Sequence, residues 1–134
     1  MTVDIACAAF VRDGKILFAR RAAHKRHFPD HWDLVGGHVE PNENVPAAMI
    51  REAREEVGLT PTVFRLLAIA TEEGVDGTTR YHVHVVTEWT GGEPKLLGDE
   101  HVAFRWVHPD DLSALQPMAH PQYASMLATL ILVP

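Results

Sequence analysis

The chain has 134 residues, of which 46% are hydrophobic and 22% are charged, and its formal net charge is −6 from 12 basic and 18 acidic residues. A chain of this length buries about two-thirds of its unfolded surface around one core, so we expect a single domain over residues 1–134. The acidic balance argues against a surface that binds nucleic acid polymers by neutralising their phosphates. No apolar stretch reaches the length of a membrane span, so we expect no membrane partner either.

The single cysteine, Cys7, lies in an apolar run near the N-terminus. A lone cysteine forms no intramolecular disulfide, which is typical of a reducing compartment. The first residues also lack the basic segment that begins a signal peptide. We therefore expect a cytoplasmic protein in which Cys7 is a small core residue.

Two strands joined by a tight turn are predicted at the N-terminus. Residues 3–11 are rich in β-branched and small apolar side chains, and a second apolar run at 16–19 follows Asp13-Gly14, a strong hairpin signal. Charge and histidine dominate from residue 20 to 30, which predicts a loop. Residues 32–35 then predict a short strand that leads into Gly36-Gly37.

A helix is predicted within the segment from Gly37 to Leu59. Asn44 is a suitable N-cap, Pro46 fits the first turn because its missing N–H is not needed there, and Gly58 is a typical helix end. Apolar residues repeat at helical spacing along one face (Met49, Ile50, Ala53 and Val57).

The rest of the chain alternates between strands and helices. Residues 63–71 and 81–89 predict two strands separated by a turn-rich segment at 72–79, and residues 102–107 predict another strand. Short helices are expected at 109–115 and 121–132. Mixed strands with helices on both faces predict an α/β fold, a three-layered α/β/α sandwich around a mixed sheet.

The helix carries three carboxylates, Glu52, Glu55 and Glu56, within an arc of about 100°. Like charges at this spacing repel one another, and a divalent cation would relieve the repulsion. Oxygen ligands suit Mg²⁺, with Mn²⁺ as a substitute. A solvated acidic face is the alternative, but it explains neither Glu43 nor Arg51, which stands one turn before Glu55.

The segment from Gly37 to Leu59 resembles the signature of the Nudix hydrolases, a MutT-like family. Its fixed positions are all filled at the spacing of that family: Gly37, Glu43, Arg51, Glu52, Glu55, Glu56 and Gly58. The resemblance implies the Nudix-type α/β/α sandwich and hydrolysis, supported by Mg²⁺, of a nucleoside diphosphate linked to another group. It also implies a small-molecule substrate that is cut within its pyrophosphate.

The resemblance also suggests roles for individual residues. Glu52, Glu55, Glu56 and the Gly37 carbonyl would bind metal, while Glu52 or Glu55 could instead accept the proton of the attacking water. Arg51 would orient a glutamate. Family members often add a carboxylate from a later loop, for which Glu100 is the candidate and Asp99 its competitor; a solvated loop acid is the alternative for both.

Candidate substrate-binding residues precede this segment. Arg20 and Arg21 belong to a cluster of basic residues, and Phe28 and Trp32 could stack on a base. Nine histidines raise the question of zinc, but His82 and His84 on one strand face have no third ligand at a suitable spacing.

We therefore predict a nucleotide pyrophosphohydrolase. The alternatives are a non-catalytic nucleotide-sensing module on the same fold and a hydrolase of a non-nucleotide diphosphate. The sequence leaves the exact substrate undetermined and a homodimer open.

Overall fold

The computed structural model describes residues 1–132, and its sheet is built around the first strand, β1 (Thr2–Arg12). The first nine residues of β1, Thr2 to Phe10, pair in parallel with β6 (Gly77–Thr90). On its other side β1 pairs antiparallel with β4 (Val35–His38), and its last residues pair with β2 (Lys15–Arg21). The mixed sheet that the sequence predicts is therefore confirmed.

The remaining strands extend this sheet in two directions. At one edge β5 (Thr60–Gly74) pairs antiparallel with β6. In the other direction β7 (His101–Val107) and β3 (Trp32–Asp33) both pair with β2. The helical elements are α1 (Val45–Val57), the 3₁₀ helix η1 (Pro109–Ala114), α2 (Gln122–Ala128) and the 3₁₀ turn η2 (Thr129–Leu132).

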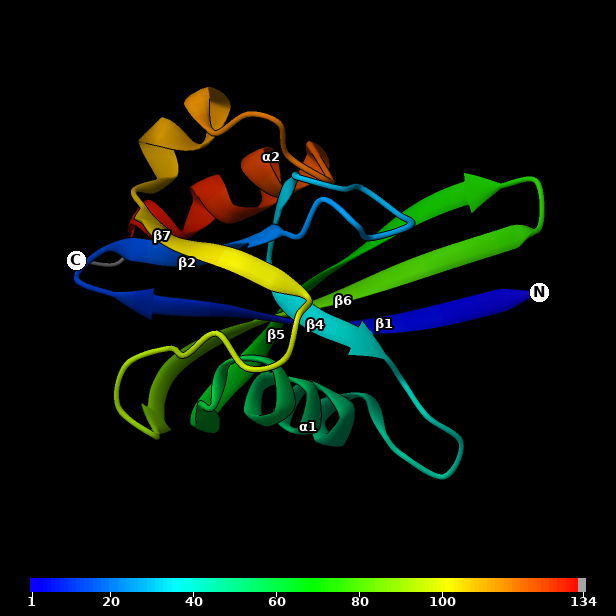
Figure 1. Ribbon diagram of the computed structural model, residues 1–134, viewed down its shortest axis with the longest axis horizontal. Helices are drawn as coiled ribbons and strands as arrows, with labels where there is room; N and C mark the ends of the chain where they lie inside the picture. Colours follow the sequence, from blue (N-terminus) through cyan, green and yellow to red (C-terminus); the bar gives the residue numbers. More distant parts are fainter. Residues whose placement is uncertain (133–134) are drawn as a thin grey trace.

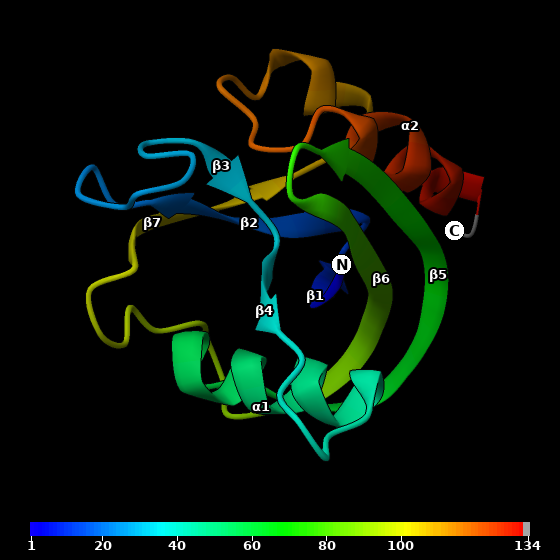
Figure 2. The ribbon, with the colours of Figure 1, turned by 90° about the vertical axis from the view of Figure 1, so that its right-hand side faces the viewer.

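Helices cover both faces of the sheet, which gives the α/β/α sandwich. In Figure 1 helix α1 lies below the strands and α2 above them, and Figure 2 shows the same layers from the side. Within residues 1–132, no helix is long and apolar enough to cross a membrane.

Alternating side chains of β1 belong to two hydrophobic cores, one on each face of the sheet. Ala6, Ala8 and Phe10 belong to the cluster packed against α1, whereas Cys7 and Ala9 belong to the cluster under α2. Cys7 is 3% exposed, so the prediction of a core cysteine is confirmed. Desolvation by burial is the main reason that the pKa of Cys7 lies well above its usual value.

Both predicted ends of helix α1 are confirmed. The side chain of Asn44 accepts a hydrogen bond of 2.8 Å from the backbone N–H of Ala47. Gly58 has a left-handed φ of 73°, and its N–H donates to the Arg54 carbonyl. These caps fix where the acidic face of α1 begins and ends.

The hairpin of β5 and β6 is longer than the sequence predicts. Residues 72–79 were expected to form an extended turn, yet only Val75 and Asp76 separate the two strands. The parallel pairing with β1 reaches Thr2 and Thr78, and the Met1 carbonyl accepts a hydrogen bond from Thr78 N–H. That pairing holds the segment extended, so the expected long turn is wrong.

Two further elements differ from expectation. The predicted strand at 32–35 is divided at Leu34, because Trp32 and Asp33 pair with β2 whereas β4 begins at Val35 and pairs with β1. The predicted helix at 121–132 is helical only to Ala128 and ends in the 3₁₀ turn η2.

Candidate active site

Strand β4 is packed closely by helix α1 and by strand β1, and these two contacts require its two glycines. A Cβ added to Gly37 would lie 2.5 Å from Cδ of Glu52, and one added to Gly36 would lie 2.2 Å from the Ala6 carbonyl oxygen. The Glu52 carboxylate therefore rests directly on the backbone of Gly37. Gly37 and Glu52, candidate metal ligands from different elements of the fold, thus lie side by side.

Arg51 connects helix α1 to the loop before it. Its guanidinium donates two hydrogen bonds to the carboxylate of Glu43, at 2.7 and 3.0 Å, and one of 3.0 Å to the carbonyl of His38. Its Nη1 also donates to Glu52 at 2.8 Å and to Glu55 at 3.2 Å. The hydrogen bonds that Arg51 donates to Glu43 are the main cause of both the lowered pKa of Glu43 and the raised pKa of Arg51.

The three helical carboxylates differ in their surroundings. The Glu55 side chain is 60% exposed, that of Glu52 is 17% exposed, and that of Glu56 is 7% exposed. Burial, followed by the nearby carboxylates of Glu52 and Glu100, raises the pKa of Glu56 to about 10. Without a bound cation, Glu56 is therefore protonated at neutral pH.

His101 lies beside Glu56, with its Nε2 3.6 Å from Glu56 Oε1. Desolvation lowers the pKa of His101, which keeps its imidazole neutral. Among the described residues, the buried side-chain nitrogen and oxygen atoms that lack a hydrogen-bond partner are His101 Nδ1 and Glu56 Oε2. Ligand atoms of Glu56, Glu100 and His101 all lie within 4.8 Å of one another.

These unsatisfied atoms fit a divalent cation. Buried polar atoms without partners are costly, and a cation with its bound waters would supply the missing interactions. It would also favour the ionised form of Glu56 and reduce the repulsion among the carboxylates. The oxygen-rich donor set is of the kind that Mg²⁺ and Mn²⁺ prefer.

A cleft of about 560 Å³ opens next to this cluster. Glu52, Gly37 and Glu100 line it, as do Arg21 and Phe28 from the predicted substrate-binding set. Arg20 and Trp32 are not among its lining residues. Arg20 pairs with Asp30 at 3.3 Å, and Trp32 packs against the core under α2.

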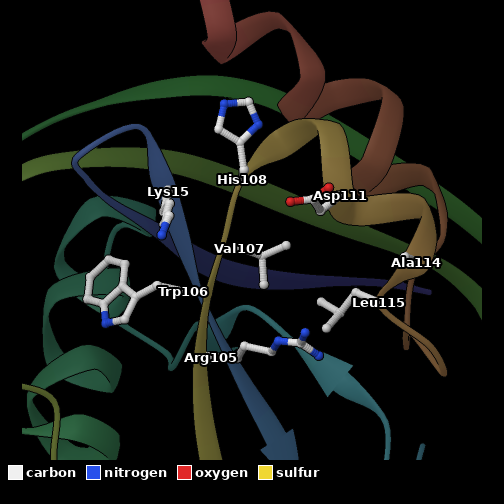
Figure 3. Close-up of a pocket in the computed structure, with 8 residues that line it drawn as sticks. All are labelled: Lys15, Arg105, Trp106, Val107, His108, Asp111, Ala114 and Leu115. Atoms are coloured by element: carbon white, nitrogen blue, oxygen red, sulfur yellow. The ribbon is translucent and has the colours of Figure 1, made fainter.

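A second cavity, of about 330 Å³, lies between β7 and η1 (Figure 3). None of its lining residues belongs to the segment from Gly37 to Leu59. Lys15 and Arg105, its two basic side chains in Figure 3, point in different directions and do not converge on one point. We therefore place the candidate site in the larger cleft.

Several residues of the cleft were not singled out from the sequence. Asp33 and Tyr81 line it, together with Lys25 and His120. Asp33 accepts a hydrogen bond from the Leu34 N–H, and burial raises its pKa to about 6. The available signals were weak: a carboxylate within a strand just before a pair of glycines, and a lysine in a loop rich in charge.

Comparisons with known proteins agree with this geometry. A family model described as NUDIX domain matches residues 2–130. The chain is 36% identical over 118 residues to the CTP pyrophosphohydrolase of Escherichia coli, covering 87% of this chain and 83% of that protein. It is 31% identical over 119 residues to the nucleoside triphosphatase NudI of Salmonella agona, covering 81% of this chain and 84% of that protein.

Solved structures show the same fold. The crystal structure of a MutT NUDIX hydrolase from Burkholderia pseudomallei matches with a TM-score of 0.82 at 29% identity, over 94% of this chain and 96% of that one. The solution structure of the E. coli ORF135 protein matches with a TM-score of 0.80 at 31% identity, over 98% of this chain and 90% of that one. The resemblance predicted from the segment between Gly37 and Leu59 is confirmed.

Proposed function

Since the chain belongs to the Nudix hydrolase family, we propose that it is a Mg²⁺-dependent pyrophosphohydrolase of a nucleoside triphosphate or a related small nucleotide. Water attacks phosphorus and the bond within the pyrophosphate breaks. CTP is the first substrate to test, because a relative with 36% identity is named a CTP pyrophosphohydrolase. We further propose that the reaction takes place in the cytoplasm.

One observation carries the proposal: the cleft is bordered by Glu52 and Glu100, next to the buried and unsatisfied carboxylate of Glu56. We assign metal binding to Glu52, Glu56 and the Gly37 carbonyl, with Glu55 as a further ligand. Mg²⁺ held by these residues would neutralise phosphate charge and lower the pKa of a nearby water.

The protein's own groups then position the reactants. Of the carboxylates predicted from the sequence, Glu52 and Glu100 line the cleft, which suits them to accept the proton of the attacking water. Glu55 also remains a candidate, although its side chain is mostly exposed and bound to Arg51. Arg51 acts as a positioning residue, because its hydrogen bonds reach Glu52 and Glu55 from the loop side of α1.

Phe28 and Arg21 are proposed to contact the substrate, since both line the cleft. The Arg21 Nε donates to the carbonyl of His27 at 2.9 Å, which fixes its side chain toward the loop. For Arg20 and Trp32 we propose supporting roles. Arg20 pairs with Asp30 of the loop, and the Trp32 carbonyl accepts a hydrogen bond from the Ala119 N–H, which connects β3 to the segment before α2.

The proposal is tested by a screen of nucleoside triphosphates and related diphosphates with Mg²⁺, in water labelled with heavy oxygen. We expect a nucleoside monophosphate and pyrophosphate from a triphosphate, with the label in one phosphate product. Tight nucleotide binding without turnover across the screen would instead favour a nucleotide-sensing module. Turnover only of diphosphates that lack a nucleoside would favour the other alternative.

A further inference from the structure

The loop between β2 and β3 is anchored next to Glu100. Its base is closed by two backbone hydrogen bonds: the Arg21 N–H donates to the His31 carbonyl at 2.8 Å, and the Asp30 N–H donates to the Arg21 carbonyl at 3.0 Å. The next residue, Ala22, donates its N–H to the carbonyl of Glu100 at 2.8 Å. The position of this loop relative to Glu100 is therefore fixed by backbone contacts.

Lys25 is the one side chain among residues 23–29 that is not exposed. Its Nζ lies 3.4 Å from Oε1 of Glu100, and its side chain is 24% exposed against 48% for Glu100. Lysine is normally a solvated surface residue. Here its ammonium group is held against a carboxylate at the wall of the cleft, which both residues line.

The Glu100 carboxylate also lies next to the cluster that is proposed to bind a cation. A ligand atom of its carboxylate lies within 4.8 Å of ligand atoms of Glu56 and His101. One carboxylate thus stands between an ammonium group and the cluster that would bind a cation. Because both partners are positive, an interaction with Lys25 weakens the attraction that Glu100 exerts on a metal ion.

We propose that Lys25 is a phosphate-binding residue that exchanges partners when substrate enters. In the nucleotide-free protein its ammonium group pairs with Glu100. When a nucleotide occupies the cleft, the ammonium group moves to a phosphate oxygen, and the Glu100 carboxylate becomes available to the metal site. This inference rests on the proposed function, because it takes the phosphates to lie beside Glu52 and Glu100.

The exchange predicts opposite effects on two affinities. Lys25→Met removes a charge-assisted contact to phosphate, so the affinity for nucleotide should fall about tenfold or more. The same change removes the competitor for Glu100, so Mn²⁺ should bind about threefold more tightly to the nucleotide-free protein. A lysine with a purely structural role would not produce this pair of opposite shifts.

Both affinities are measured without catalysis. Free Mn²⁺ is followed by electron paramagnetic resonance, and nucleotide binding is followed by calorimetry at saturating Mn²⁺ with an α,β-methylene analogue of CTP. Lys25→Arg keeps the charge and should recover most of the nucleotide affinity. Lys15→Met removes an exposed lysine at the separate cavity of Figure 3 and should change neither affinity.

A second control separates the contact from general electrostatics. Arg26→Met removes one positive charge from the same loop. Arg26 also lines the cleft, but among the described residues no ion pair joins it to a carboxylate. The Mn²⁺ affinity should rise less in this variant than in Lys25→Met. An equal rise in both variants would overturn the exchange.

Other outcomes would overturn it as well. These are unchanged nucleotide affinity in Lys25→Met, a fall of both affinities together, and a wild-type protein that does not bind the analogue. A protein that binds Mn²⁺ and the analogue but turns over no substrate would contradict the proposed function alone. The inference about Lys25 would then still be decided by the two affinities.

Discussion

The buried surroundings of Glu56 disfavour its charged form, and a bound cation would offset this free-energy cost. The Glu56 carboxylate is buried beside Glu52, Glu100 and His101. We expect Glu56→Gln to lower kcat about 10³-fold or more, because an amide is a poorer ligand for the cation that is proposed to act in the transition state. Steady-state kinetics with Mg²⁺ on the best substrate of the screen measures the effect.

Glu88→Gln is the matched control, since Glu88 is an exposed carboxylate on β6. Its kcat should equal that of the wild-type protein. Circular dichroism should show that both variants are folded. A folded Glu56→Gln protein with wild-type turnover would refute the metal assignment.

The raised pKa of Glu56 also predicts how the stability of the metal-free protein depends on pH. Folding favours the protonated form, so the stabilisation is complete below the usual pKa of 4.5 and is lost as pH rises toward about 10. Thermal unfolding in a chelator should therefore show Tm falling between about pH 7 and 8.5, a window above the usual pKa of 6.5 for His101. The pKa of His101 is lowered by folding, so its contribution makes stability rise with pH, and this contribution changes only below the window.

Two comparisons check whether Glu56 causes this fall of Tm with pH. In Glu56→Gln the fall of Tm over the same window should be much smaller, because the amide does not titrate. Added Mg²⁺ should raise the Tm of the wild-type protein more at the higher pH, since binding requires the ionised carboxylate. An equal slope in both proteins would assign it to another group.

Helix α1 shows how an element sets the geometry of the site. Its first turn is fixed by the hydrogen bond of 2.8 Å from Ala47 N–H to the side chain of Asn44. Asn44→Ala should lower the free energy of unfolding by about 1 kcal/mol. Gln116→Ala removes an exposed amide outside α1 whose one side-chain hydrogen bond is to the Ser113 carbonyl, and it should have a much smaller effect. Chemical denaturation monitored by circular dichroism compares the two, and equal losses would contradict the capping role.

The sequence was sufficient to predict helix α1 and its ends, because capping residues and apolar spacing are local signals. It was not sufficient for the β5 and β6 hairpin, where Gly74 and Gly77 suggested a longer turn. The strands extend because Thr78 pairs with the N-terminal residues of the chain, more than 70 positions away. Similarly, the break at Leu34 follows from two different partner strands, which composition does not reveal.

At the scale of the whole molecule, the cleft is assembled from segments that only the fold brings together. Gly37 and Glu52 were identified from their spacing, but Lys25, Asp33 and His120 reach the same cleft from other parts of the chain. Lys25 and His120 make contacts that are distant in sequence, such as the hydrogen bond of 3.0 Å between His120 Nδ1 and Glu72. The half of the cleft that is proposed to bind metal could thus be predicted from the sequence, whereas in the half proposed to face the rest of the substrate only Arg21 and Phe28 were predicted.

The chemistry of that second half bears on substrate choice, and we expect that the protein is not a dedicated hydrolase of oxidised guanine nucleotides. Reading the oxidised edge of the purine takes a donor and an acceptor side by side, which an asparagine or glutamine amide supplies most directly. The asparagines, Asn42 and Asn44, both lie in the loop before α1. Gln122 already donates to Glu72 at 2.7 Å, and Gln116 is exposed and donates to the Ser113 carbonyl.

A protonated carboxylic acid could replace the amide, but neither Asp99 nor Asp33 favours this, and a bound cation would favour the ionised form of Glu56. Asp99 is 89% exposed and lies near His24, and Asp33, with a pKa of about 6, is mostly ionised at pH 7.5 and can only accept hydrogen bonds. The ratio of kcat/KM for 8-oxo-dGTP to that for dGTP should therefore stay below about 10², which corresponds to about 2.7 kcal/mol of discrimination. Parallel assays of both nucleotides and of CTP measure it. A larger preference for the oxidised base would show that some other group of the cleft reads its edge.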